Sequence, residues 1–83
     1  MSNQTKLQNV FRKVLSIPET VDVINVKYGE SPGRDWDSLQ HMLLITLIED
    51  EFDLMIEIND VSEIRSYIDA ETVLSKYGVD FQV

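Results

Sequence analysis

The chain has 83 residues, 15 of them acidic and 7 basic, a formal net charge of −8 and no cysteine. This length predicts a single domain over residues 1–83, because two halves would each be too small for a core. Binding to nucleic acid or to anionic membranes is disfavoured, since both need a basic surface. Without cysteine there are no disulfides, no thiolate chemistry and no Cys-based zinc site. The acidity favours protein partners with basic docking patches.

No segment is typical of a targeting signal or a membrane span. Residues 1–6 are polar and lack the apolar stretch of a signal peptide. The longest apolar run, residues 42–45, is far shorter than a bilayer requires. We therefore expect a cytoplasmic monomer that does not insert into membranes.

Residues 4–16 are predicted to form an amphipathic helix. Asn3 is the expected N-cap. Pro18 should close the segment, because proline disfavours helical geometry in the residue before it. The apolar side chains recur at the spacing of one helical face, and they are Leu7, Val10, Phe11 and Val14.

Residues 17–36 have no helical period and are predicted to form a long loop. The β-branched residues between Val21 and Val26 leave a short strand as the alternative. Loops of this length are uncommon in small domains and are often functional.

The strongest helix pattern covers residues 38–53. Asp37 is the expected N-cap, and Gln40 three residues later gives a partial capping box. Two further helices are predicted over residues 59–65 and 69–77, the second of them stopped by Gly78. The candidate caps are Asn59 or Asp60 for the short helix and Ser66 or Asp69 for the last. The prediction is an all-α fold, a small four-helix bundle of three longer helices and one short helix, with a long loop between helices 1 and 2.

The predicted helix over residues 38–53 has two apolar stripes where a surface helix has one. Leu44, Ile45, Ile48 and Phe52 form the first stripe. Leu39, Leu43 and Leu47 form the second, which Glu49, Asp50 and Asp53 flank. Either the helix is buried on two sides, or the second stripe is an acid-rimmed docking face for a partner.

The start and end of this helix resemble the acyl carrier protein family. Trp36-Asp37-Ser38-Leu39 opens the helix and Glu49-Asp50-Glu51-Phe52 ends it. The hallmark of the family is Asp-Ser-Leu at the start of the second helix, with an acidic-Phe ending. The resemblance extends over nearly the whole chain, and the chain looks like a free-standing carrier.

The resemblance implies that Ser38 is the covalent attachment site of 4′-phosphopantetheine. A phosphopantetheinyl transferase would move this arm from coenzyme A to the serine, and its thiol would carry an acyl group as a thioester. The sulfur is thus imported into a chain that has no cysteine. The resemblance implies that Asp37 and Leu39 bind partner enzymes. The second apolar stripe and its acidic rim add Leu43, Leu47 and Asp50 as candidate partner-binding residues.

The resemblance also implies that the chain is not itself an enzyme. Catalysis would belong to acyl-transferring, synthase or ligase enzymes with basic and apolar docking patches. No acid–base pair or nucleophile–base set is evident in the sequence. No metal site is expected, because the sequence from Asp35 starts like a calcium loop but lacks its glycine and its closing glutamate.

Two positions depart from the carriers of general fatty-acid synthesis. Gln40 and Leu43 stand where those carriers commonly have acids, and the acids are concentrated later, over residues 49–53. This departure favours a specialised acyl pathway. The alternatives are an aminoacyl or peptidyl carrier, such as a D-alanyl carrier, and an acidic interaction module that is never modified.

Three residues near Ser38 have open roles. Arg34 is either solvated or paired with the phosphodiester, and Trp36 either anchors the loop or packs against the arm. His41, the only histidine, is expected to be a partly buried packing residue and not a catalyst.

Overall fold

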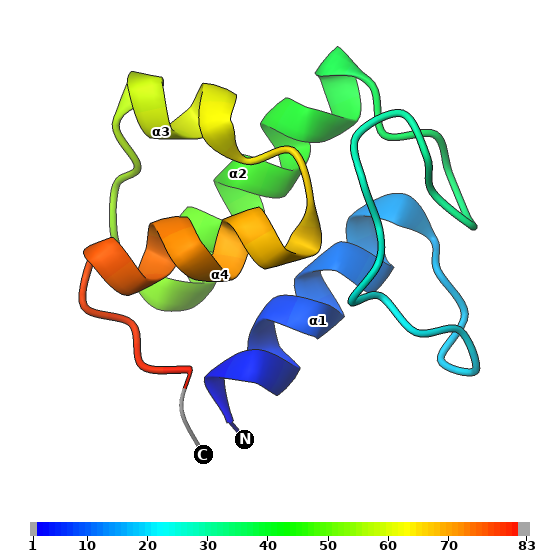
Figure 1. Cartoon of the computed structure of the whole chain (residues 1–83), viewed down its shortest axis with the longest axis horizontal. Coiled ribbons are helices and arrows are strands. Elements are labelled where there is room, and N and C mark those ends of the chain that lie inside the picture. Colours follow the sequence, from blue (N-terminus) through cyan, green and yellow to red (C-terminus); the bar gives the residue numbers. More distant parts are fainter. Residues whose placement is uncertain (1, 82–83) are drawn as a thin grey trace.

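The computed structural model describes residues 2–81, which fold into four α-helices (Figure 1). The three longer helices, the short helix and the long first loop confirm the predicted all-α four-helix bundle. The helices are α1 (Asn3–Leu15), α2 (Ser38–Phe52), α3 (Ile58–Glu63) and α4 (Tyr67–Lys76).

The alternative of a strand over residues 21–26 is wrong. Between residues 2 and 81 there is no strand, only isolated bridges from Lys27 to Glu30 and to Ser66. Two of the β-branched residues, Val23 and Val26, are instead buried in the core and attach the loop to it.

Both ends of α1 differ from the prediction by one residue. The N-cap is Ser2, whose hydroxyl accepts from the Thr5 N–H at 3.1 Å. Asn3 is not the cap: it lies in the first turn, and its amide donates to the Asp80 carbonyl at 2.9 Å, which ties the two ends of the chain together. At the other end the helix stops at Leu15, because Ser16 has a left-handed φ of 52°. The helix thus ends before Ile17, the residue in which Pro18 disfavours helical geometry.

The predicted cap of α2 is confirmed, because Asp37 Oδ1 accepts from the Gln40 N–H at 2.9 Å. The capping box is not completed, however. Gln40 is buried, and its Oε1 has no hydrogen-bond partner. The helix ends at Phe52, one residue early, because Asp53 takes a left-handed φ of 52°.

The start of α3 was predicted wrongly. It begins at Ile58, and neither Asn59 nor Asp60 is its cap, since Glu57 occupies that position without a side-chain bond. The Asp60 carboxylate is engaged elsewhere, by the Tyr77 hydroxyl at 2.6 Å and by the Lys76 ammonium at 2.9 Å.

Of the two candidate caps of α4, Ser66 is the correct one. Its hydroxyl accepts from the Asp69 N–H at 3.0 Å, so the helix starts at Tyr67, two residues before the prediction. Gly78, with φ of 93°, follows the helix end as expected.

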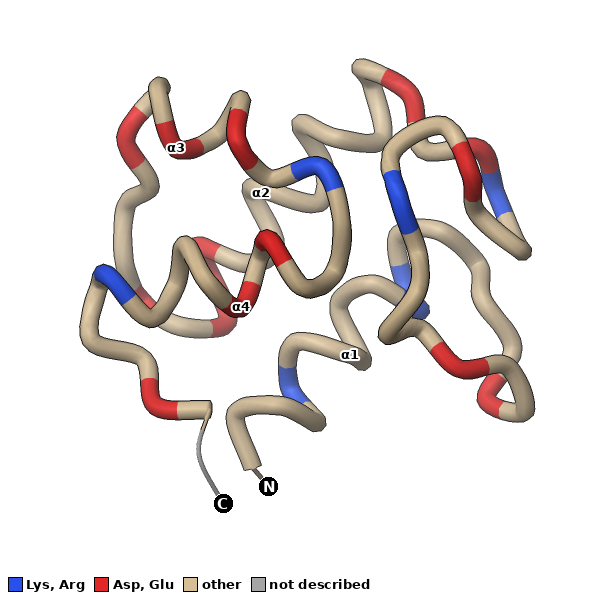
Figure 2. The backbone as a smooth tube through the Cα atoms, in the orientation of Figure 1, with Lys and Arg blue, Asp and Glu red and all other residues tan. Residues whose placement is uncertain are grey.

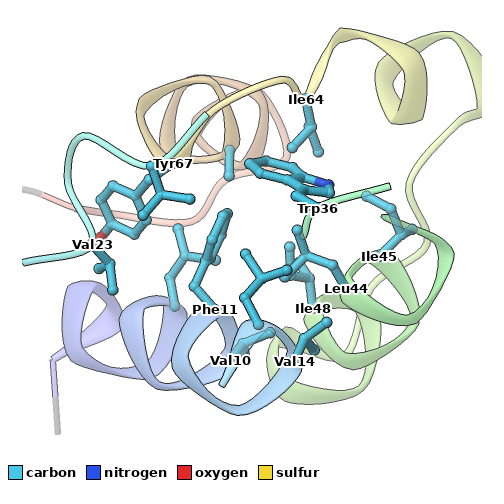
Figure 3. Packing of buried hydrophobic residues seen from close by; sticks show 14 of the residues in the cluster. Val10, Phe11, Val14, Val23, Trp36, Leu44, Ile45, Ile48, Ile64 and Tyr67 are labelled. Atoms are coloured by element: carbon cyan, nitrogen blue, oxygen red, sulfur yellow. The ribbon is translucent and has the colours of Figure 1, made fainter. Parts of the chain in front are cut away.

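The core lies where α1, α2 and α4 meet (Figure 3). All four apolar residues predicted for the inner face of α1 are buried. Phe11 makes edge-on contacts with Trp36 and Tyr67, at ring-centre distances of 5.5 and 5.3 Å. One aromatic side chain of α1 therefore joins the long loop to α4.

The long loop is fixed by backbone hydrogen bonds near its C-terminal end and near its middle. The Arg34 N–H donates to the carbonyl of Leu15 at the end of α1, at 2.5 Å. Gly33 allows this approach, since a Cβ there would lie 2.2 Å from the same carbonyl oxygen. Nearer the middle, the Tyr28 N–H donates to the Arg65 carbonyl at 2.7 Å. This fixed loop sets the position of the residues that open α2.

Candidate functional site

Ser38 is the first residue of α2 and is exposed. Its position follows from the sequence, because the adjacent Asp37 caps the helix and leaves the serine on the first turn. Its hydroxyl oxygen lies 3.3 Å from the Tyr28 hydroxyl oxygen, its one hydrogen-bond contact within residues 2–81. Within residues 2–81 no carboxylate or imidazole forms a hydrogen bond with this hydroxyl.

A hollow of about 330 Å³ adjoins Ser38 between the long loop, α2 and α3. We call it the Ser38 hollow. Its apolar lining comes from Met42, Ile58 and Val61. Its polar lining, besides Ser38, comes from Tyr28, His41, Ser62 and Arg65.

His41 connects three elements beside this hollow. The Trp36 indole N–H donates to His41 Nδ1 at 2.9 Å, and His41 Nε2 lies 2.8 Å from the Val61 carbonyl oxygen. An indole N–H only donates, so Nδ1 is the acceptor and Nε2 carries the proton that goes to Val61. His41 is half-buried, as predicted, and Trp36 is only 1% exposed. Trp36 therefore anchors the loop, and its buried ring is not available to pack against a group attached at Ser38.

Arg65 lies over the ring of Tyr28, with its Cζ atom 4.7 Å from the ring centre. Its guanidinium has no carboxylate within 4.0 Å, since every ion pair among residues 2–81 involves Lys76. The Asp69 carboxylate accepts from the backbone N–H of Arg65 instead, at 3.2 Å. The sequence did not predict the contact between Tyr28 and Arg65, because these residues are far apart in the chain and follow no shared local pattern.

The predicted three-leucine stripe of α2 does not form one surface. Leu39 and Leu43 are 68% and 47% exposed, whereas Leu47 is half-buried and packs against the core. Met42, which the sequence assigned to neither stripe, is 57% exposed. The exposed large apolar side chains of α2 are therefore Leu39, Met42 and Leu43, and we call the surface that they form the outer face.

Asp50, a predicted partner-binding residue, is exposed but lies apart from the Ser38 hollow. It lines a separate groove of about 260 Å³ between α1 and α2, together with Leu47 and the lysines Lys6 and Lys13. Of the neighbouring acids, Glu49 is structural, since its Oε2 accepts from the Ile56 N–H at 2.8 Å. Figure 2 shows that acidic positions also occur along α3, α4 and the long loop, so the acidity is not confined to the end of α2.

Arg34 does not take part in the Ser38 hollow. Its side chain is exposed and is absent from the lining, and its fixed contact is the backbone bond to Leu15. The structure therefore places Arg65, which is distant in sequence, beside the hollow in place of the nearer arginine.

None of the helices within residues 2–81 has both the length and the apolar character needed to cross a bilayer. Comparison of the chain with protein-family models, curated proteins and solved structures gives no match. The case for a function therefore depends on the residues around Ser38 and their arrangement.

Proposed function

We propose that this chain is an acyl carrier protein, and that Ser38 receives 4′-phosphopantetheine from coenzyme A through a phosphopantetheinyl transferase. One observation carries the proposal. An exposed serine opens a capped helix directly after a fixed loop, and it borders a hollow with apolar walls. The Asp37-Ser38-Leu39 sequence at this point is the motif that resembles the carrier family.

The residues around Ser38 fit such an arm. The serine hydroxyl is exposed, and its contact with Tyr28 is a long one of 3.3 Å. The N-terminus of α2 favours a negatively charged group such as a phosphodiester, because its N–H groups and dipole point toward it. When bound, the arm would supply a terminal thiol for the acyl group. The chain's own residues would orient the arm and leave it accessible.

The outer face supports docking by partner enzymes. Leu39, Met42 and Leu43 are exposed within the first two turns of α2, where Gln40 is buried and no acid occurs. Burial of these side chains by a partner would supply binding energy without ion pairs. We therefore propose transferase, synthase or ligase partners from a specialised cytoplasmic pathway, whose docking patches are largely apolar.

The decisive experiment is an intact-mass measurement after incubation with coenzyme A and a phosphopantetheinyl transferase of broad specificity. Wild type should gain about 340 Da, the mass of the arm. Ser38→Ala should gain nothing. Ser62→Ala is the matched control, because Ser62 has a hydroxyl in the same hollow and should not be needed. No gain in wild type, or a gain in Ser38→Ala, would refute the proposal and favour the unmodified interaction module.

The hollow favours an acyl cargo over an aminoacyl cargo. Met42, Ile58 and Val61 offer apolar contact, and no carboxylate of the described chain lines the hollow to receive an ammonium group. Mild base hydrolysis of protein recovered from its native source should therefore release a carboxylic acid that has no amino group. Release of an amino acid would show that the protein is an aminoacyl carrier.

A further inference from the structure

We propose that Arg65, held against Tyr28, binds the phosphodiester that joins the arm to Ser38. This inference rests on the proposed function. It assigns to Arg65 the role of positioning the arm. The ligand is an anion tethered to the Ser38 oxygen.

Arg65 is held in place before any arm is attached. Its backbone carbonyl accepts from the Tyr28 N–H at 2.7 Å, which fixes the α3–α4 connection to the long loop. Its Nε donates to the Ser62 carbonyl at 3.2 Å. The guanidinium lies over the Tyr28 ring, and the hydroxyl of that ring is 3.3 Å from Ser38 Oγ. Tyr28 therefore lies between the cation and the serine, and all three line one hollow.

The charge of Arg65 is not neutralised locally. The protein carries a net charge of −8, yet the guanidinium forms no ion pair within residues 2–81. With Nε directed to Ser62, the two terminal nitrogens remain as a donor fork that suits two oxygens of a phosphate. The Tyr28 hydroxyl provides another donor beside the serine oxygen. A phosphodiester on Ser38 would thus gain charge-assisted hydrogen bonds on a surface that is otherwise acidic.

Arg34 is the competing cation, because it lies only four positions before Ser38 in the sequence. Its side chain is exposed and does not line the Ser38 hollow. Arg34→Gln is therefore the matched control for Arg65→Gln, since each variant removes one positive charge near the motif.

The test begins with the modified protein, whose mass gain is established first. The ¹⁵N–¹H resonance of Arg65 Nε should shift between the unmodified and modified wild type. That shift should shrink as salt is raised to about 0.5 M, because salt screens the pairing of exposed charges. An Arg65 resonance that is unchanged by modification would overturn this inference and leave the proposed function intact. Absence of the mass gain would overturn both.

The ³¹P resonance of the modified protein gives the independent check. It should differ between wild type and Arg65→Gln, and it should be the same in wild type and Arg34→Gln. A ³¹P resonance that changes in Arg34→Gln and not in Arg65→Gln would contradict the inference. Inorganic phosphate added to Ser38→Ala distinguishes a tethered from a free anion. If free phosphate shifts the Arg65 resonance and modification does not, the pair binds free anions and the inference is wrong.

Discussion

The two faces of α2 carry similar side chains in opposite environments. On the inner face, Leu44 and Ile48 are fully buried. On the outer face, Leu39 and Leu43 are 68% and 47% exposed, and Met42 of the same face lines the Ser38 hollow. Folding explains the first set, because its burial removes apolar surface from water. Folding does not explain the second set, and an apolar surface beside a candidate attachment site is what a partner would bind.

The inner face predicts the largest effect on stability. Leu44→Ala should lower the free energy of unfolding by about 2–5 kcal/mol, because it leaves a cavity in the centre of the core. Leu39→Ala on the outer face should change it by less than about 0.5 kcal/mol. Chemical denaturation of both variants measures the difference. Equal losses would contradict the assignment of the two faces.

His41 lies between the two faces and predicts an intermediate effect. His41→Phe keeps a ring beside Trp36 but leaves the indole N–H and the Val61 carbonyl without their partner. The expected loss is about 1–3 kcal/mol, the cost of unsatisfied buried polar groups. Tyr28→Phe is the control, since it removes only a long hydrogen bond between exposed hydroxyls. A loss in the control as large as that in His41→Phe would argue against the connecting role of His41.

No residue of α3 is fully buried, and Val61 packs only partly against the core, so polar contacts contribute to holding this helix. Asp60 accepts from the Tyr77 hydroxyl and pairs with Lys76, and these contacts hold the pKa of its carboxyl below the usual range. Since the pKa is lower in the folded state, the contribution of Asp60 to stability is present above about pH 4 and is lost as the pH falls through the lowered value.

Asp60→Asn should therefore weaken the dependence of the melting temperature on acid pH. Asp35→Asn is the matched control, because Asp35 is exposed and forms no comparable contact within the described chain. The change is expected to be small, since the Lys76 side chain is 54% exposed and solvent screens its pairing with Asp60. If the melting temperatures of wild type and Asp60→Asn depend on acid pH in the same way, the Asp60 carboxylate does not help to hold α3.

Leu43→Glu should have the smallest effect on stability but the clearest effect on partner choice. It places an acid where carriers of general fatty-acid synthesis commonly have one, at an exposed site. Wild type should be acylated poorly by enzymes of general fatty-acid synthesis, and Leu43→Glu should be acylated faster. A wild type that is already a good substrate and is unaffected by the substitution would refute the specialised pathway.

The helices and the inner core could be predicted because their signals are local. The helical period is visible in the spacing of Leu7, Val10, Phe11 and Val14. Asp37 accepts from the Gln40 N–H, only three residues further along the chain. The errors at Asn3 and at the start of α3 have the same origin. Polar residues that could act as caps there are engaged by distant parts of the chain instead: Asn3 by the Asp80 carbonyl, and Asp60 by Tyr77 and Lys76. As a result, α3 starts without a side-chain cap.

The surroundings of Ser38 could not be predicted in the same way. The Tyr28–Arg65 pair and the bridge from Trp36 through His41 to Val61 join segments that meet only after folding. The half-burial of Leu47 likewise depends on where α1 crosses α2, which no periodicity specifies. The motif thus predicts Ser38 as a candidate site, whereas its neighbours are seen only in the tertiary structure.

The most direct test of the central claim is to locate the added mass within the modified protein. Cleavage after Arg34 and Arg65 releases residues 35–65 as one peptide, in which Ser38 and Ser62 are the only serines. Fragmentation of this peptide should place the gain of about 340 Da on Ser38. Placement on Ser62, or an unmodified peptide after complete incubation with the transferase, would contradict the account.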